Sequence, residues 1–202
     1  MNRPKCLTYR HHQLAGFWSC LSGDIGRYLT KSPNNVAAGN TAKTRISAFL
    51  TPELLCLALY RISHYLYVKN FHRTAALLSC VNTLLRKISI TQSCIGPGCR
   101  LPHPGEVTFH GCAGSGLTLY ALAICCSDTA HIGGPVEMGP CLGDRVTVGG
   151  RSVLMGSMTV GDDAKVGFSV NLSSDVPART LVISKVNRKR FVSDQTALTH
   201  SK

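Results

Sequence analysis

Histidine is the residue type in this sequence that can act as an acid or base near neutral pH, and His103 is the best placed of the eight histidines. Pro102 and Pro104 flank it and would stiffen the backbone that holds the ring. Such an imidazole could take the proton of a hydroxyl group that attacks a carbonyl carbon. Taken alone, however, a histidine at a strand corner is more often structural than catalytic, so the surrounding pattern must decide.

The ten cysteines offer thiol chemistry or metal binding, but their spacing favours neither. There is no CxxC pair, and Cys125 and Cys126 are adjacent. Free thiols that act as small core or surface residues are therefore the preferred interpretation.

The elements that must position these residues are indicated by a period of six. An aliphatic or small residue recurs at every sixth position in two runs, and glycine often follows it. The runs are Ile95, Leu101, Val107, Ala113, Leu119, Cys125 and Leu142, Val148, Leu154, Val160, Val166, Leu172. Neither a helix nor an alternating strand gives this period. A hexapeptide β-helix does, because each six-residue side of a three-sided coil sends one aliphatic residue inward.

We therefore predict a mainly β protein, a parallel β-helix of hexapeptide repeats preceded by a small helical domain that caps it. Thr51, Pro52 and Glu53 predict a helix start, and a second helix is expected over about 73–87. On that second helix the apolar residues Ala76, Leu77, Cys80, Leu84 and Leu85 share one side. The predicted divisions are an N-terminal segment 1–45 that is weakly ordered or carries a short helix at 23–29, a helical cap 46–90, a β-helix 91–178 and a basic tail 179–202.

The repeat also predicts where the chain leaves the coil. The period fails between the two runs, so we expect the segment 126–141, with its glycines and prolines, to bulge outward as a loop on a binding face. Three hexads make a coil of 18 residues, so Cys94 and Cys112 should stack on successive coils, about 4.8 Å apart.

The composition of the chain narrows the classes of partner that it is expected to bind. The formal net charge is +12, but the basic residues are scattered apart from a cluster at Lys185, Arg188, Lys189 and Arg190. No nucleic-acid module is recognisable, so a phosphorylated small ligand explains the charge better than a nucleic acid. We see neither an apolar run long enough to span a membrane nor a signal peptide, and we expect a cytoplasmic protein.

Beyond the repeat, the sequence resembles the serine acetyltransferase family of hexapeptide acyltransferases. The segment YRISHYLYVKNFHRTAALL is similar to that family's "HRIAHWLY" helix, and CIGPGCRLPHPGEV is similar to the segment that carries a histidine in a "DH" pair. The stretch LGDRVTVGGRSVLMGSMTVGDDAKVGFSVNLSSDVPA follows its last coils and closing turn. The resemblance covers roughly residues 50 to 180.

This resemblance implies a left-handed coil, a homotrimer or dimer of trimers, and an acetyl-CoA site between neighbouring subunits. It implies that His103 is the catalytic base that deprotonates the acceptor hydroxyl. The residues that it implies for the acetyl-CoA site are Ser127, Gly149, Gly150, Lys165 and Gly167. No metal is expected. Serine is the family's acceptor, and cysteine biosynthesis would be the corresponding pathway.

The departures from the family pattern concentrate around the acceptor. The family's carboxylate lies in a "DIHP" segment, but 89–92 holds no acid, and Pro102 replaces the aspartate before the catalytic histidine. The family loop carries an arginine and a second histidine where this chain has residues 137–140, including Glu137, and His131 is out of register.

Three alternatives therefore stay open: an acyltransferase with another small-molecule acceptor, such as a sugar or specialised metabolite, a degenerate CoA-binding scaffold trimer, and a zinc lyase. The zinc site would need His103, His110 and His131 to converge, although His103 and His110 occupy different slots of adjacent hexads.

Overall fold

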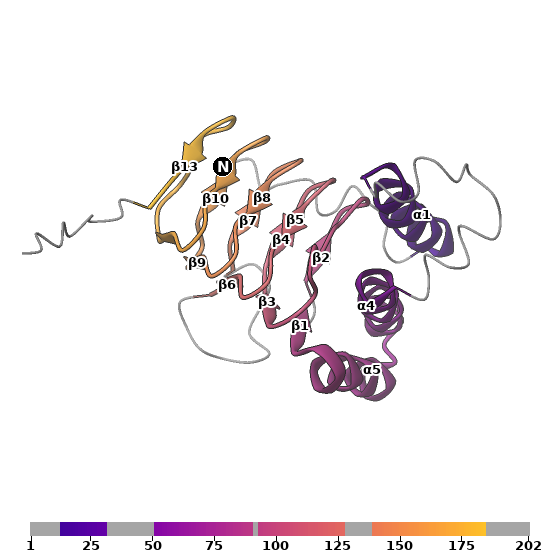
Figure 1. Cartoon of the computed structure of the whole chain (residues 1–202). Helices are drawn as coiled ribbons and strands as arrows, with labels where there is room; N and C mark the ends of the chain where they lie inside the picture. The colour runs from indigo at the N-terminus through magenta and orange to yellow at the C-terminus, as the bar shows by residue number, and fades with distance from the viewer. Residues whose placement is uncertain (1–12, 32–50, 91–92, 128–138, 185–202) are drawn as a thin grey trace, which may run out of the picture.

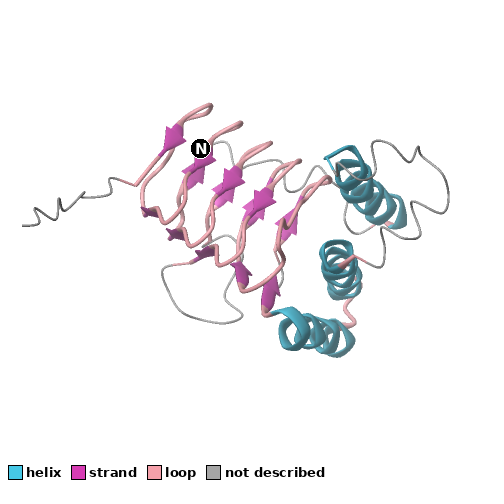
Figure 2. Cartoon of the chain, viewed as in Figure 1, coloured by secondary structure: helices cyan, strands magenta, loops and turns pink. Residues whose placement is uncertain are grey.

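The computed structural model describes residues 13–31, 51–90, 93–127 and 139–184. In this part of the chain three helices lie at one end of a three-sided coil of short strands, as Figure 1 shows by element and Figure 2 by secondary structure. The helices are α1 (Leu14–Lys31), α4 (Pro52–Val68) and α5 (His72–Arg86).

The strands form three parallel sheets, one for each side of the coil. The first sheet holds β1 (Ile88–Ile90), β3 (Val107–Phe109), β6 (Ile124–Cys126), β9 (Val153–Met155) and β12 (Asn171–Leu172). The second sheet holds β2 (Cys94–Ile95), β4 (Cys112–Ala113), β7 (Cys141–Leu142) and β10 (Thr159–Val160). The third sheet holds β5 (Thr118–Leu119), β8 (Thr147–Val148), β11 (Lys165–Val166) and β13 (Leu181–Val182). The predicted left-handed parallel β-helix with a helical cap is confirmed.

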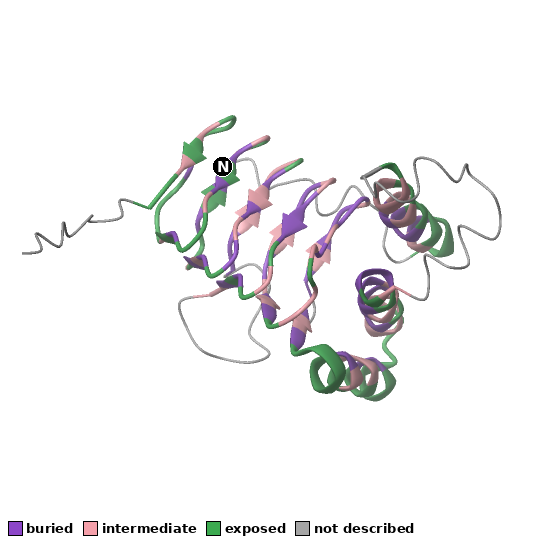
Figure 3. Cartoon of the chain, in the orientation of Figure 1, coloured by how far each residue is buried: buried purple, intermediate pink, exposed green. Residues whose placement is uncertain are grey.

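The residues that recur at every sixth position do point into the coil. All members of the two predicted runs are buried except Leu172, which is partly buried, and Figure 3 shows this buried column along the inside of the coil. Cys94 pairs with Cys112 and Val153 with Asn171, eighteen residues apart in each case. The stacking predicted for Cys94 and Cys112 is therefore confirmed. The interpretation of the cysteines as free thiols is wrong for Cys94, which is disulfide-bonded.

The corner that carries His103 departs from this regularity. Arg100 pairs with Thr118, eighteen residues later, whereas Phe109 pairs with Cys125, only sixteen residues later. The segment from Arg100 to Phe109 in the first coil is therefore two residues longer than the matching segment from Thr118 to Cys125 in the second coil. Because Val107 and Phe109 are both buried, the buried residues keep their period of six through this turn. The sequence pattern therefore does not reveal the two extra residues.

One helix prediction needs correction. The short helix expected at 23–29 is part of α1, which begins nine residues earlier at Leu14. On α5 the apolar residues expected to share one side face away from the core: Leu77, Leu84 and Leu85 are 65%, 78% and 63% exposed. The side of α5 that packs inward carries Ala75 and Asn82, and Asn82 donates a hydrogen bond to the Cys56 carbonyl of α4.

The helices close the first coil through polar side chains as well as apolar contact. Arg61 donates to the carbonyls of Ile95 and Gly96 and forms a buried ion pair with Asp24, whose carboxylate accepts the N–H of Cys99. Burial raises the pKa of Asp24, and the charge of Arg61 opposes that rise.

Two further side chains act in the same way. Tyr60 donates to the Ser93 carbonyl, and Glu53 accepts the N–H of Leu101. A terminal coil leaves backbone groups without a neighbouring strand, and unpaired buried groups of this kind are costly. Helices α1 and α4 therefore supply hydrogen bonds that a preceding coil would have made.

Candidate functional site

The turns that join the third sheet to the first sheet form one edge of the coil, which we call the histidine corner (residues 102–106, 120–122, 149–151 and 167–169). A hollow of about 340 Å³ opens there. Its lining comes from four successive levels of the coil: Pro102, His103, Tyr120, Ala121, Leu122, Gly150, Arg151 and Phe168.

His103 lies in the two-residue extension of this corner, and its side chain is exposed. The backbone of His103 has a φ of 60°, and Glu106 in the same turn has a φ of 50°, whereas each of the next three turns of the corner contains one such residue. Non-glycine residues adopt this left-handed conformation rarely and mostly where the surrounding structure holds them. The extension therefore lifts the imidazole out of the coil and into the hollow.

Among the described residues that line the hollow none is acidic, so none of them places a carboxylate beside the imidazole. Pro102 occupies the position at which the resembled family has an aspartate. Glu106, the acid nearest in sequence, forms an ion pair with Lys87 at 2.6 Å instead. The aspartate that the sequence lacks before His103 is thus not replaced by another acid among the described residues that line the hollow.

Gly150 shares the hollow with His103, as a donor-binding role requires. A Cβ atom at Gly150 would lie 2.9 Å from the Ala121 carbonyl oxygen and 3.1 Å from the Phe168 ring, so only glycine keeps this surface open. Within the described residues the N–H of Gly150 donates no backbone hydrogen bond, while those of Gly149 and Gly167 pair with Val166 and Val182. The Gly150 N–H is therefore available to an oxygen atom of a ligand.

The remaining predicted donor residues lie elsewhere on the chain. Lys165 begins β11, at the opposite end of that strand from Gly167. It lines a second hollow, of about 380 Å³, with Arg145, Asp163 and Arg179. Hydrogen bonds from Arg145 lower the pKa of Asp163, and the charges of Arg145, Arg179 and Lys165 lower it further.

Ser127 follows the far end of β6 from the histidine corner. A single chain therefore brings His103 together with Gly150 and the adjacent Gly149 and Gly167, but not with Lys165 or Ser127. His110 lies beyond β3, where its N–H donates to the Cys125 carbonyl. His131, Glu137 and the basic cluster at 185–190 lie outside the described residues.

The lining residues that sequence reasoning missed follow from the same stack of coils. Tyr120 lies eighteen residues after Pro102, and Phe168 lies eighteen residues after Gly150. Extending Gly150 by one coil would have found Phe168, whereas Tyr120 follows only from Pro102, the neighbour of the predicted His103. Arg151 had a weaker signal, its position directly after Gly150.

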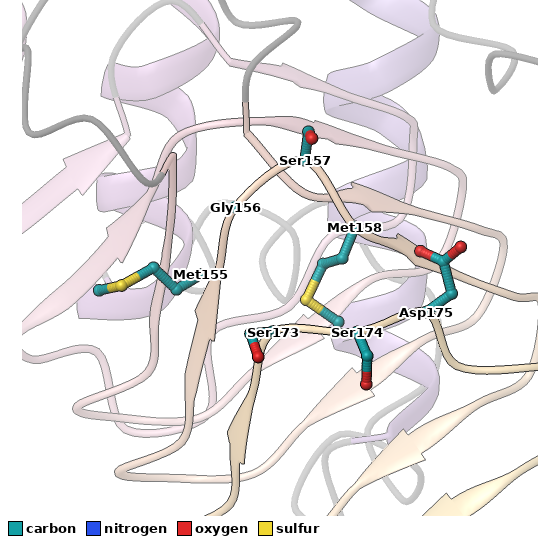
Figure 4. Close-up of a pocket in the computed structure, with 7 residues that line it drawn as sticks. All are labelled: Met155, Gly156, Ser157, Met158, Ser173, Ser174 and Asp175. Carbon is teal, nitrogen blue, oxygen red and sulfur yellow. The ribbon is translucent and has the colours of Figure 1, made fainter.

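A larger hollow, of about 460 Å³, lies beyond β9 and contains none of the predicted residues. Figure 4 shows Met155 and Met158 with three serines around it and Asp175 at its edge. The Asp175 carboxylate accepts the N–H of Thr159 at 2.7 Å, which gives it a structural role in the last coil.

The described part of the chain holds neither a metal-binding cluster nor a helix that could cross a membrane. No group of three or more His, Cys, Asp or Glu side chains in this part of the chain is placed to hold a metal ion. Among the helices that the structure describes, none combines the length and apolar character needed to cross a membrane.

Comparison with known proteins agrees with the fold. No family model matches the chain. A serine acetyltransferase of Helicobacter pylori (strain ATCC 700392 / 26695) is 30% identical over 169 residues, which are 81% of this chain and 92% of that protein.

Among solved structures, the serine acetyltransferase of Neisseria gonorrhoeae is similar with a TM-score of 0.72 at 20% identity and covers 85% of this chain. Isoform 3 from Entamoeba histolytica, solved in complex with cysteine, has a TM-score of 0.74 at 17% identity and covers 94%. This chain spans 64% and 66% of the length of those two solved chains, respectively, and at such identities the likeness shows the fold alone.

The similarity to the Helicobacter protein extends over nearly all of that relative, and the coil, its cap and the histidine corner lie within a fold shared with the solved enzymes. The chain belongs to the serine acetyltransferase family of acyltransferase enzymes.

Proposed function

We propose that this chain transfers an acetyl group from acetyl-CoA to a hydroxyl group of a small acceptor, with His103 as the general base. The observation that carries the proposal is that His103 and Gly150 share one hollow, with the imidazole exposed and the Gly150 surface open. The relatives are named serine acetyltransferases, so serine is the first acceptor to test.

In the proposed reaction His103 removes the acceptor hydroxyl proton while the oxygen attacks the thioester carbonyl carbon. The carbonyl oxygen gains negative charge, and the N–H of Gly150 is a donor that can stabilise it. When the intermediate collapses, the carbon–sulfur bond breaks, and the imidazolium returns its proton to the departing CoA sulfur. The products are the acetyl ester and CoA.

We propose that the complete site forms between copies of the chain, in a trimer. Lys165 and Ser127 lie at the other ends of β11 and β6 from the histidine corner, so one copy does not bring them to its own His103. A neighbouring copy whose charged groups face this hollow would supply them. The predicted donor-site residues would then all serve one acetyl-CoA molecule.

The test follows CoA release with L-serine and then with a panel of alcohols, sugars and amines, beside calorimetry with CoA alone. We expect turnover with at least one hydroxyl acceptor and saturable CoA binding. CoA binding without turnover on any acceptor would refute the enzymatic proposal and favour the second candidate, a CoA-binding scaffold. That candidate is supported by one observation: none of the described residues that line the hollow supplies a carboxylate beside His103.

A further inference from the structure

The outer face of the second sheet carries a column of three cysteines. Cys94, Cys112 and Cys141 begin β2, β4 and β7, and each pairs Cα to Cα with the next one up the coil. The residue that follows each of them is buried in the core, so the alternation of a strand points the cysteine side chains outward. All three cysteines are partly exposed. We call this column the cysteine ladder.

The levels of the ladder differ in oxidation state. Cys94 is disulfide-bonded, whereas Cys112 and Cys141 are thiols. The other cysteines of the described residues are thiols too, so the sulfur atom bonded to Cys94 lies outside this part of the chain. The ladder therefore has a disulfide on its lowest level and a thiol directly above it.

The backbone holds the levels of the ladder at a spacing that suits a disulfide. The Cys94 N–H donates to the Gly111 carbonyl at 3.2 Å, and the Cys112 N–H donates to the Pro140 carbonyl at 3.1 Å. These hydrogen bonds join successive coils, whose strands are about 4.8 Å apart. Disulfides usually join Cα atoms that are about 4.4 to 6.8 Å apart. Neighbouring levels of the ladder can therefore form a disulfide, whereas Cys94 and Cys141, which are two levels and about 10 Å apart, cannot.

Exposure distinguishes the ladder from the thiols of the core. A disulfide is attacked by a thiolate, and burial in apolar surroundings keeps a thiol protonated. Burial raises the pKa of Cys99 to about 12 and also raises that of Cys125. Cys80 is exposed, but it lies on α5 and not in a sheet. Among the described residues, the ladder is thus the place where a partly exposed thiol stacks on a disulfide.

We propose that the cysteine ladder is a site of thiol–disulfide exchange. The Cys112 thiol gives its proton to solvent, and the resulting thiolate attacks the Sγ atom of Cys94. A Cys94–Cys112 bond forms while the bond between Cys94 and its original partner breaks, and the partner's sulfur leaves as a thiolate that takes up a proton. One disulfide is lost and one is made, so the step needs neither an oxidant nor a reductant.

A second exchange moves the disulfide one level higher. The Cys141 thiol loses its proton to solvent, its thiolate attacks the Sγ atom of Cys112, and the Cys94 sulfur leaves and is protonated. The disulfide then joins β4 to β7. The ladder thus replaces a covalent link on the coil nearest the cap with one between the two coils above it.

The test maps disulfides by mass spectrometry in the full chain, purified without reductant and incubated at pH 8 without oxygen. The remaining thiols are then alkylated in mild acid with N-ethylmaleimide. Trypsin cuts after Arg100 and chymotrypsin after Tyr120, so the three cysteines fall on separate peptides. We expect peptide pairs linked through Cys94 and Cys112 and through Cys112 and Cys141, with an unchanged number of alkylated thiols.

The thiol count separates exchange from oxidation, because a new disulfide made by oxidation consumes two thiols. Linked pairs that appear only with a loss of two thiols would overturn the proposal, and so would the lack of linked pairs. Incubation in guanidinium chloride should instead link Cys112 to cysteines throughout the chain. The same mixture from the folded protein would show that the fold does not direct the exchange, and would overturn the proposal too.

Three variants test the order of the exchange. Cys112→Ser should remove both linked pairs, because the remaining two ladder cysteines are too far apart to bond. Cys141→Ser should remove the upper pair and keep the lower one. Cys80→Ser is the matched control, an exposed thiol outside the ladder, and should keep both pairs. A Cys94–Cys141 pair in Cys112→Ser would overturn the proposed order.

Discussion

Two corners of the same coil share a backbone geometry and differ in what their side chains do. At the corner between the second and third sheets, which we call the charged corner, the left-handed positions are Gly98, Gly116, Arg145, Asp163 and Arg179. At the histidine corner they are His103, Glu106, Leu122, Arg151 and Ser169.

At the charged corner the carboxylates have partners within the chain. Arg145 makes two hydrogen bonds to Asp163, and the Asp144 and Asp162 carboxylates accept backbone N–H groups of Ser115 and Asp144. The histidine corner differs in keeping an exposed imidazole in a hollow where none of the described lining residues is acidic. The comparison teaches that left-handed turn geometry alone does not identify a binding site. A binding site is identified by polar groups that the chain leaves available to a ligand.

The largest expected effect is loss of the base at the histidine corner. His103→Ala should lower kcat about 10²- to 10⁴-fold, because the acceptor hydroxyl would then lose its proton without assistance. His72→Ala, an exposed histidine on α5 away from this corner, is the control. Steady-state CoA release measures both, and an unchanged kcat in His103→Ala would reject the role of the imidazole.

A side chain at Gly150 should have the next largest effect. Gly150→Val places atoms against the Ala121 carbonyl and the Phe168 ring and closes part of the hollow. We expect the Kd for CoA to rise about tenfold or more, equivalent to one lost hydrogen bond with a charged or strongly polar group. Calorimetry measures this, with Gly26→Ala as the control because nothing lies within 4 Å of a Cβ at Gly26. Unaltered CoA binding in Gly150→Val would separate Gly150 from the donor site.

The same kind of change at the charged corner should affect stability and not binding. Gly116 has a φ of 72°, so Gly116→Ala puts an L-residue into the left-handed region at a cost of about 1–2 kcal/mol. Denaturant unfolding should show the loss, while the Kd for CoA stays at the wild-type value. If CoA binding weakened more than stability, the contrast between the two corners would fail.

The smallest expected effect concerns the ion pair of the charged corner. Arg145→Gln should lower the Tm slightly at pH 7, because the pair is exposed. Arg145 lowers the pKa of Asp163 in the folded chain, so the pair's contribution is present above the unfolded carboxyl pKa of about 4 and is lost as the pH falls through the lowered value.

Thermal melts of the wild type and Arg145→Gln test this prediction. The difference in Tm should be constant between pH 7 and pH 5 and should shrink in more acidic buffer. A difference that grew on acidification would contradict the assignment of the ion pair as its cause.

Most of the fold was predictable because the coil repeats one physical requirement. Each side must bury one residue, so Ile95, Leu142 and their equivalents reveal the period without any tertiary information. The capping helices were predictable as helices. The sequence did not indicate which side of α5 packs inward: Ala75 and Asn82 are buried, and the apolar Leu77, Leu84 and Leu85 are exposed.

The site was predictable in part for the same reason. His103 and Gly150 belong to motifs with a family counterpart, and the structure brings them into one hollow. The two-residue extension that lifts His103 out of the coil was hidden, because burial of both Val107 and Phe109 preserved the inward series. Arg151 had no counterpart in the resembled motifs, and its place in the hollow became visible only in the structure.

The hydrogen bonds that Tyr60 and Arg61 donate to the first coil, and that Glu53 accepts from it, have a consequence for how such a chain can change in evolution. All of them involve the lowest level, so the cap would accept a solenoid of any height above it. Duplication of an eighteen-residue unit above the level of Phe168 would leave both the cap and the histidine corner in place. The end of the coil that contacts the cap is therefore fixed, whereas the number of coils at the other end is free to vary.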